Sequence, residues 1–271
     1  MAACSKSSGL SNEASTSAMD ISDILSQFEC PVCSEYVQAP IVQCKSGHLV
    51  CANCRPKIKR CPVCRGPLKD IRNLAMEKLA CSIMFPCKYA GRGCTVSLFN
   101  KEMAEHAKAC EFQPYSCPCP GSPCTWQGYL EEVLPHLNTL HNNIATRTGN
   151  DIIFNAIDVD IFGKVDWAMI QKCFDHSFMI VLQKRELIKG KEQFFAYVQL
   201  IGTREQATKF KYRLQLVGQG PQLLWETNSS SIHDEVSPEF MKSECLVFDT
   251  CLAPLYGKDC NIDISVTIFE E

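Results

Sequence analysis

The chain has 271 residues, of which 46% are hydrophobic, and its formal net charge at pH 7 is -3. This length corresponds to about two domains, and the small negative charge excludes a general attraction to nucleic acid or to an anionic membrane surface. No window approaches the roughly 18 uncharged apolar residues of a membrane helix, so we expect neither a membrane nor a nucleic acid as partner.

Residues 1–27 begin the chain with many Ser, Ala and Asn and few large apolar side chains. This composition is typical of disordered segments, so the sequence predicts a disordered tail. The same stretch lacks the apolar core of a signal peptide. We therefore expect the protein in a reducing compartment, the cytoplasm, with the nucleus as a second location.

Nineteen cysteines are the most unusual feature of the composition, and fourteen of them fall between Cys30 and Cys124. In a secreted chain this density would indicate a disulfide framework. In a reducing compartment, closely paired thiols more often hold a metal.

Residues 28–68 form the first predicted domain, in which seven cysteines and one histidine lie between positions 30 and 64. They form four pairs at gaps that let a tight turn direct both side chains at one ion, which predicts two tetrahedral zinc sites. Protein ligands saturate both sites, so the zinc is structural and not catalytic. Spacing alone leaves open whether the pairs interleave or bind zinc in sequence, as in two zinc ribbons. The pairs are Cys30 and Cys33, Cys44 and His48, Cys51 and Cys54, and Cys61 and Cys64.

The end of this domain is rich in positive charge. Residues 55–72 contain seven Lys or Arg side chains and one acid, Asp70. Such a run is typical of a solvated face, and it is equally compatible with a surface for an acidic partner.

Residues 69–84 are predicted to form a connecting helix with Asp70 as its N-cap. Four apolar residues recur at helical spacing and would share one face. They are Ile71, Ala75, Leu79 and Ile83.

Residues 85–145 contain a repeat with the spacing of two zinc fingers. In both copies six residues separate the two cysteines, and eleven more precede a histidine. The spacing predicts a hairpin that supplies the cysteines and a helix that supplies the last pair. With the first domain, this makes four zinc ions. The predicted ligands are Cys87, Cys94, His106 and Cys110 in the first finger, and Cys117, Cys124, His136 and His141 in the second.

Two roles are open for the fingers: stiffening the join between domains, which is the simpler interpretation, or binding nucleic acid. The finger helices carry roughly as many acids as bases, which disfavours phosphate contacts. Pro135 directly precedes His136 and is expected to interrupt a long recognition helix.

Residues 146–271 consist of short apolar or alternating segments with turns between them. The segments are rich in Val, Ile, Phe and Tyr and have the length of strands. Repeated strands of this kind predict an all-β antiparallel sandwich with its own core. The segments begin at residues 151, 178, 194, 210, 223, 244 and 262.

This order of domains resembles the seven-in-absentia (Sina/Siah) family of RING-type ubiquitin-protein ligases, and the resemblance covers nearly the whole chain after residue 27. The first domain has the ligand order of a RING finger, with its single central histidine. The matching strings are FECPVC, CKSGHLVCANCRPK, CPVCRGPL, IRNLAMEKLA, FPCKYA, PYSCPCPG, WQG, FFAYVQLIGTR, SIH and CLVFDT.

The resemblance implies that the RING ligands interleave, so that Cys30, Cys33, Cys51 and Cys54 bind one zinc while Cys44, His48, Cys61 and Cys64 bind the other. It also implies a ligase that binds a ubiquitin-charged conjugating enzyme and directs ubiquitin to substrate lysines, which marks the substrate for proteasomal degradation. Such a ligase orients its partners and forms no covalent intermediate.

By comparison with RING fingers, Val32, Ile58 and Pro62 form the apolar surface that receives the conjugating enzyme. Arg65 matches the arginine that hydrogen-bonds both the conjugating enzyme and ubiquitin, a role that suits the planar fork of donors. The plain alternatives are packing within a small domain for Val32 and Ile58, and solvation for Arg65.

The sandwich resembles the family's TRAF-like substrate-binding domain, which is a homodimer and binds extended peptides, often of the form Pro-x-Ala-x-Val-x-Pro. Strand addition to a sheet edge is a suitable binding mode. The family's peptide lies near KVDWAM, so Val165, Trp167 and Met169 are candidate contacts, although Trp167 fits a core position equally well. Ala145 and Arg147 stand where the family commonly has Thr and Leu, and a charged Arg147 is expected to alter or weaken peptide recognition.

Two alternatives to a RING ligase follow from other features. A TRAF-like adaptor with an inactive RING is disfavoured because the expected contact residues for the conjugating enzyme are intact. A covalent ligase would need a reactive thiol, and we expect structural thiols and no catalytic cysteine. The cysteines outside the zinc sets are Cys4, Cys81, Cys119, Cys173, Cys245, Cys251 and Cys260.

Overall fold

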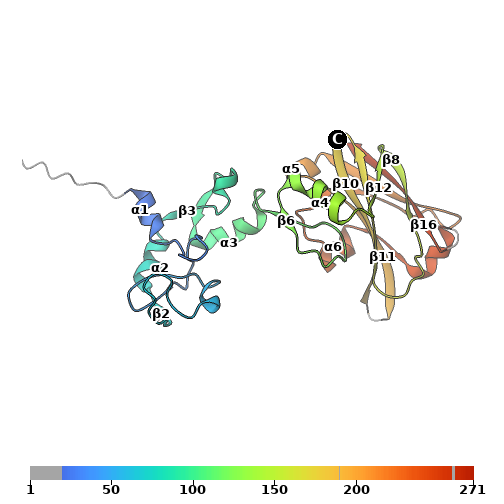
Figure 1. Cartoon of the computed structure of the whole chain (residues 1–271). Helices are drawn as coiled ribbons and strands as arrows, with labels where there is room; N and C mark the ends of the chain where they lie inside the picture. The colour runs from blue at the N-terminus through green and yellow to red at the C-terminus, as the bar shows by residue number, and fades with distance from the viewer. Residues whose placement is uncertain (1–19, 189, 258–259) are drawn as a thin grey trace, which may run out of the picture. The chain divides into compact units, whose positions relative to one another are not determined.

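The computed structural model describes residues 20–188, 190–257 and 260–271. The chain divides into two compact units, Met1–Phe112 and Gln113–Glu271, which run from blue to green and from green to red in Figure 1. The boundary falls between the two zinc fingers, which the sequence had grouped as one domain over residues 85–145.

The predicted disordered tail extends too far. Residues 1–19 lie outside the described residues, but Ile21–Ser26 form the helix α1. Ile24 and Leu25 pack against the buried core of the first unit. Because these two apolar side chains have a core to bury in, the last turn of the tail belongs to the folded domain.

The first unit has little regular structure. Its elements after α1 are β1 (Val42–Gln43), the 3-10 turn η1 (Arg55–Lys57), β2 (Ile71–Arg72), α2 (Leu74–Ala80), β3 (Met84–Pro86), the 3-10 turn η2 (Ala90–Arg92), β4 (Ser97–Phe99) and α3 (Asn100–Ala109). The strands pair antiparallel, β1 with β2 and β3 with β4. One core joins Phe28 and Ile41 to Phe85 and Met103, so the first finger shares its interior with the preceding domain.

The predicted connecting helix over residues 69–84 is shorter and has a different N-cap. α2 begins after Asn73, whose side chain accepts a hydrogen bond from the Met76 N–H at 3.0 Å. Asp70 instead pairs with Arg55 at 2.7 Å, because β2 lies between Asp70 and the helix.

The buried face of α2 also differs from the prediction. Ala80 is buried and Met76 packs against the core, whereas Ile71 and Leu79 are exposed. The Glu77 carboxylate accepts the Ile41 N–H at 3.0 Å. These contacts make α2 part of the first domain and not a free connection.

The second unit contains the second finger and a sandwich of two sheets. Its elements are β5 (Tyr115–Ser116), β6 (Gln127–Gly128), α4 (Leu130–Leu140), β7 (Ala145–Thr148), β8 (Asp151–Ala156), β9 (Val165–Cys173), β10 (His176–Ile188), β11 (Lys191–Leu200), α5 (Arg204–Ala207), β12 (Phe210–Val217), β13 (Leu224–Asn228), β14 (Ser230–Ser231), α6 (Pro238–Ser243), β15 (Leu246–Asp249), the 3-10 turn η3 (Thr250–Leu255) and β16 (Ile262–Glu270).

One sheet has the strand order β14-β11-β10-β9-β7, with β15 also on β11, and the other has the order β13-β12-β16-β8. The predicted antiparallel sandwich is confirmed, with two parallel pairings, β7 with β9 and β11 with β14. Side chains such as Phe178, Leu214 and Ile264 fill the space between the sheets. No helix of the described ranges is long and apolar enough to cross a membrane.

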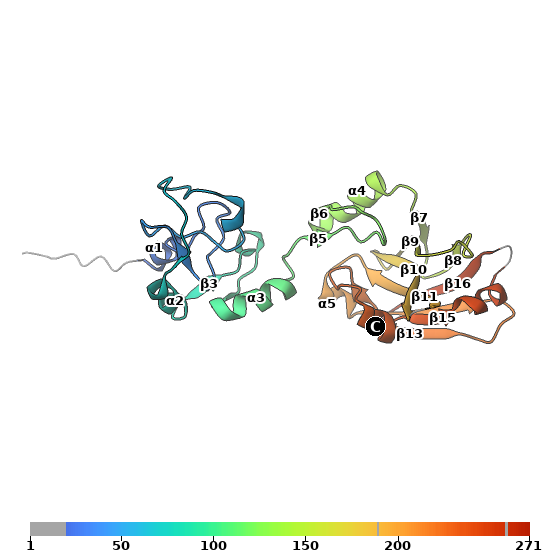
Figure 2. The ribbon, with the colours of Figure 1, turned by 90° about the horizontal axis from the view of Figure 1, so that it is seen from below.

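The two sheets differ in how their faces are covered. β12 and β16 alternate buried and half-buried residues, as expected for strands with one face on a core. Residues 178–184 and 194–200 are instead buried in succession. The other sheet covers one face of these strands, and the second finger and α6 cover the other; Figure 2 shows α4 and the β5–β6 hairpin beside β9 and β10.

Candidate metal centres

All sixteen predicted zinc ligands fall into four groups of four, and within each group the ligand atoms lie within 4.8 Å of one another. In the RING the two groups interleave along the chain, which decides between the crossed and the sequential arrangement. The groups are Cys30, Cys33, Cys51 and Cys54; Cys44, His48, Cys61 and Cys64; Cys87, Cys94, His106 and Cys110; and Cys117, Cys124, His136 and His141.

Two of the Cys-x-x-Cys pairs have the same local turn, which we call the knuckles, Cys30–Ser34 and Cys61–Arg65. The N–H of the last residue of each knuckle donates to the carbonyl of the first at 2.8 Å. Ser34 and Arg65 adopt left-handed backbone conformations, with φ of 58° and 57°. This turn directs both sulfurs of a pair to one side, which explains the two-residue gap.

The histidines differ in the nitrogen that faces the sulfurs. His48 lies with Nδ1 3.4 Å from the Cys44 sulfur. His106, His136 and His141 present Nε2 to cysteines of their groups at 3.5, 3.7 and 3.3 Å. The short loop from Cys44 to His48 brings the near ring nitrogen to the site, whereas the helical histidines reach with the far one.

The electrostatics of the groups favour a bound cation. Hydrogen bonding to the Cys51 sulfur, together with burial, raises the pKa of Cys54 to about 12. The Gly66 N–H lowers the pKa of Cys64 to about 6. Burial and then the neighbouring thiols raise the pKa of Cys110 to about 12. Within a group the neighbouring sulfurs raise the pKa of thiols such as Cys54 and Cys110, a repulsion that a bound cation relieves, and tetrahedral Cys/His sets fit zinc.

The two fingers have the predicted hairpin and helix. The cysteines of each finger lie in the loop of a hairpin, β3–β4 or β5–β6, and the last two ligands lie in or just after α3 or α4. The expected interruption at Pro135 is wrong, because α4 runs through it. Proline removes a single helical hydrogen bond there, while the buried side chains of Val133 and Leu137 hold the helix on both sides.

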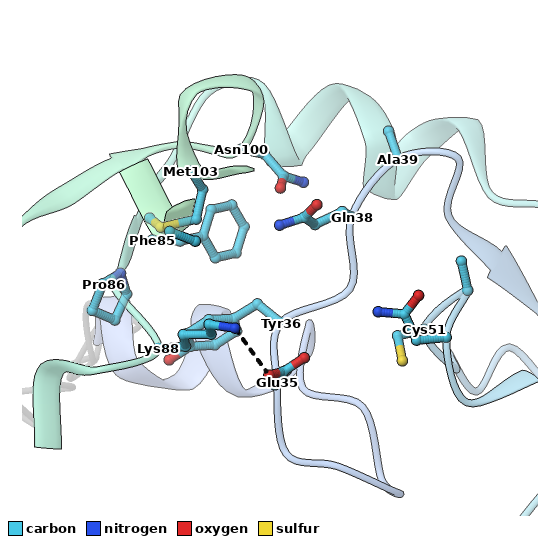
Figure 3. A pocket seen from close by; sticks show the side chains of 13 residues that line it. Glu35, Tyr36, Gln38, Ala39, Cys51, Phe85, Pro86, Lys88, Asn100 and Met103 are labelled. Carbon is cyan, nitrogen blue, oxygen red and sulfur yellow. Dashed lines mark ion pairs between the residues drawn. The ribbon is translucent and has the colours of Figure 1, made fainter. Parts of the chain in front are cut away.

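The first finger packs on the RING through Phe85. Its ring lies 5.2 Å from that of Phe28, edge to face, and 5.2 Å from that of Tyr36. Figure 3 shows Phe85 beside Met103, with the ion pair of Lys88 and Glu35 (4.0 Å) nearby. The contact between the RING and the first finger is therefore an apolar core with a charged rim.

The second finger packs on the outer face of the larger sheet. Tyr115 stacks on His233, with ring centroids 3.6 Å apart. Val133 and Leu137 join Met179 in one buried cluster. The sandwich and the second finger therefore form one structural unit.

The candidate contact residues for a conjugating enzyme lie on the RING surface. Val32 is 44% exposed, and Pro62 and Arg65 are exposed on the second knuckle. Ile58 is half-buried and packs against the RING core, so only part of its side chain is accessible. Val63, which the sequence reasoning missed, is 54% exposed beside Pro62; its place between two ligand cysteines was the available signal.

The candidate substrate contacts lie on β9, which the sequence did not identify as a strand. Met169 is 4% exposed and belongs to the core between the sheets, so its proposed side-chain contact with a peptide is corrected. Val165 is half-buried, and Trp167 is half-buried against that core and donates from Nε1 to the Ile157 carbonyl at 2.8 Å. Trp167 therefore has a structural role on this edge.

The edge of β9 is partly covered. β7 pairs with residues 169–172 of β9, so residues 165–168 have no strand on that side among the described residues. Ala145 and Arg147 are exposed on β7, opposite Met169 and Gln171. β7 runs parallel to β9 and begins, at Ala145, directly beyond the open stretch of β9.

The remaining thiols differ in burial. Burial raises the pKa of Cys245 to about 12 and that of Cys173 to about 11, and burial also raises the pKa of Cys119. The raised pKa values keep these three thiols in the protonated form, which is the weaker nucleophile. Cys81, Cys251 and Cys260 are exposed, and Cys4 lies outside the described residues.

Interleaved zinc groups, two further fingers and a two-sheet sandwich define a RING-type zinc protein with a TRAF-like domain. Family profiles match three segments: "E3 ubiquitin-protein ligase sina/sinah, RING finger" over residues 30–64, "Sina, zinc finger" over 78–154 and "Sina, TRAF-like domain" over 171–267. The chain is 54% identical to E3 ubiquitin-protein ligase SIAH2 of Homo sapiens over 91% of this chain and 76% of the relative. It is also 54% identical to E3 ubiquitin-protein ligase sina of Drosophila melanogaster over 91% and 78%. The chain belongs to the Sina (seven-in-absentia) family.

Proposed function

We propose that this chain is a RING-type ubiquitin-protein ligase. The observation that carries the proposal is the interleaved pair of metal groups, which holds Val32 and Pro62 exposed on the two knuckles of one small domain. The relatives named above carry the name of this activity, which supports the same conclusion.

The proposed mechanism is orientation without covalent chemistry by the ligase. Zinc, held by four protein ligands at each site, stabilises the fold and offers no open coordination position. Val32 and Pro62, with the accessible part of Ile58, receive the conjugating enzyme. Arg65 projects from a backbone fixed by its hydrogen bond to Cys61 and donates to both the conjugating enzyme and ubiquitin. Holding the two together lowers the barrier to transfer onto a lysine.

The sandwich is the proposed substrate-binding domain. An extended peptide would add to the open edge of β9 at residues 165–168, with main-chain hydrogen bonds for affinity and the exposed side chains of β7 for selection. We also propose that the sandwich forms a homodimer, that the protein acts in the cytoplasm and nucleus, and that bound substrates are degraded by the proteasome.

The ligase proposal is tested with activating enzyme, a panel of conjugating enzymes, ubiquitin and ATP. We expect ubiquitin ladders with the natural chain and none with Val32→Arg, because a charge on the knuckle prevents apolar docking. Val96→Arg, which changes another exposed valine in the same unit (36% exposed), should keep the ladders. Absence of ladders with every conjugating enzyme, from protein shown to hold four zinc ions, would favour the adaptor.

The substrate proposal is tested with a labelled peptide of the form Pro-x-Ala-x-Val-x-Pro. Arg147→Leu should strengthen binding several-fold, on the order of 1 kcal/mol, because it removes a charge beside an apolar peptide. Lys211→Leu, on the far sheet, serves as the control. Equal affinity of all three proteins would remove Arg147 from the site.

A further inference from the structure

The end of the RING forms a closed loop, residues 55–70, that carries an excess of positive charge. Arg55 at its start is paired with Asp70 at its end, with Nη2 and Oδ1 2.7 Å apart. A β-bridge joins Arg60 to Pro67 in the middle. The loop therefore presents its side chains from one compact structure and not from an extended tail.

Most of this charge is not neutralised within the protein. The single acid of the loop, Asp70, is occupied by Arg55, and Arg72 just beyond the loop pairs with Glu77 at 2.7 Å. Five further cations are exposed and form no ion pair with any residue in the described part of the chain. We call them the basic surface: Lys57, Lys59, Arg60, Arg65 and Lys69.

The basic surface includes the neighbours of two exposed apolar residues. Pro62 and Val63 are exposed between Arg60 and Arg65 in the sequence, at the tip of the second knuckle. Protein interfaces commonly combine an apolar centre with a polar or charged rim. The same knuckle carries Pro62 of the proposed docking surface for the conjugating enzyme, so the rim continues that surface.

We propose that the basic surface selects conjugating enzymes that carry acidic side chains around their RING-contacting face. The inference rests on the proposed ligase function and adds the chemistry of the partner. Exposed like charges around a docking site accelerate encounter with an oppositely charged partner and disfavour neutral or basic ones. The zinc-bound thiolates of the RING leave about three formal negative charges, which is fewer than the five exposed cations.

Binding and activity are measured separately. Fluorescence anisotropy gives the Kd of the full-length, zinc-loaded protein for uncharged conjugating enzymes that differ in the charge of their contact face. Discharge of preformed ubiquitin conjugates onto free lysine gives KM and kcat. Both measurements are repeated from low to high salt, about 0.03 to 0.3 M. Over this range the Debye screening length shortens to a few ångströms.

The test variant is Lys57→Glu/Lys59→Glu, and the matched control is Lys78→Glu/Lys101→Glu, which changes the net charge equally at exposed sites on α2 and α3 of the same unit. At low salt we expect the test variant to raise Kd and KM about tenfold for an acidic conjugating enzyme and to leave kcat unchanged. At high salt it should converge with the natural chain. The control should follow the natural chain throughout.

Three results would overturn the inference: an unchanged Kd in the test variant at low salt, an equal loss in the control, or an equal loss with conjugating enzymes of every charge. A loss of oligonucleotide binding with unchanged conjugating-enzyme binding would assign the basic surface to nucleic acid instead. If the natural chain binds acidic conjugating enzymes in this way but discharges no ubiquitin, the ligase function fails and the charge selection stands.

Discussion

The two zinc fingers have the same leading ligand spacing, but each shares a core with a different domain. In the first finger, Cys87, Cys94 and Cys110 are buried in a core shared with the RING. In the second, Cys117 and Cys124 are half-buried, and the finger packs on the sandwich. Ligand spacing therefore sets the local fold of a finger, while the side chains around the ligands choose its neighbour.

An aromatic residue occupies the same position in both fingers. Phe85 and Tyr115 each stand two residues before the first cysteine, and both are buried. Phe85 meets Phe28 and Tyr36, whereas Tyr115 stacks on His233. The aromatic side chain at this position therefore packs one finger on the RING and the other on the sandwich.

Zinc removal should have the largest effect and should divide the molecule at this boundary. The core of the first unit includes ligand sulfurs such as Cys30 and Cys87, whereas the core between the two sheets contains none of the zinc ligands. Structural zinc contributes on the order of 10–16 kcal/mol per site. With a strong chelator we expect hydrogen exchange to become fast throughout residues 28–112 and to stay slow in β10–β12.

Tryptophan fluorescence provides the check, because all three tryptophans, Trp126, Trp167 and Trp225, lie in the second unit. The emission of Trp126, in the second finger, should change, and that of Trp167 and Trp225, which are half-buried against the core between the sheets, should stay the same. Loss of slow exchange in β10–β12 at the same chelator concentration would contradict the division.

Truncating one buried side chain in each finger should destabilise one unit at a time. Phe85→Ala leaves a cavity between the RING and the first finger and should cost about 3–5 kcal/mol in the first unit. Leu137→Ala, in the second finger, should cost about 2–5 kcal/mol in the second unit. Denaturant unfolding with tryptophan emission should respond to Leu137→Ala alone, and zinc release to a colorimetric chelator should respond mainly to Phe85→Ala. Phe99→Ala, an exposed position, is the control for both.

The ring stack of the second finger should have a smaller effect. His233→Ala removes the partner of Tyr115 and should cost about 1 kcal/mol, whereas His233→Phe preserves the stack. A double-mutant cycle with Tyr115→Ala measures the coupling in denaturant unfolding. A coupling energy near zero would show that the stack does not hold the finger on the sheet.

An effect of similar size or smaller is expected at α2, which precedes the first finger. Asn73→Ala should cost about 1 kcal/mol, because the helix loses its N-cap hydrogen bond. Asp70→Ala should cost less, since its ion pair with Arg55 leaves Asp70 mostly exposed. Thermal unfolding of the first unit compares the stability lost in the two variants. A larger loss in Asp70→Ala than in Asn73→Ala would identify Asp70 as the N-cap.

The sequence by itself determined the features that depend on short-range spacing. Gaps of a few residues predict the sixteen ligands and the hairpin and helix of each finger. Alternation over the length of one strand predicts most strands of the sandwich. The sulfurs of Cys30 and Cys33 must point to one site whatever surrounds them, because the knuckle turn is local.

Only the tertiary structure decided which segments bury one another. Side chains from distant parts of the chain decide four features. These are the helix at residues 21–26, the division between the fingers, the cap at Asn73 and the burial of Met169. Burial is a property of both partners in a contact, and a periodic or spaced pattern identifies only one of them.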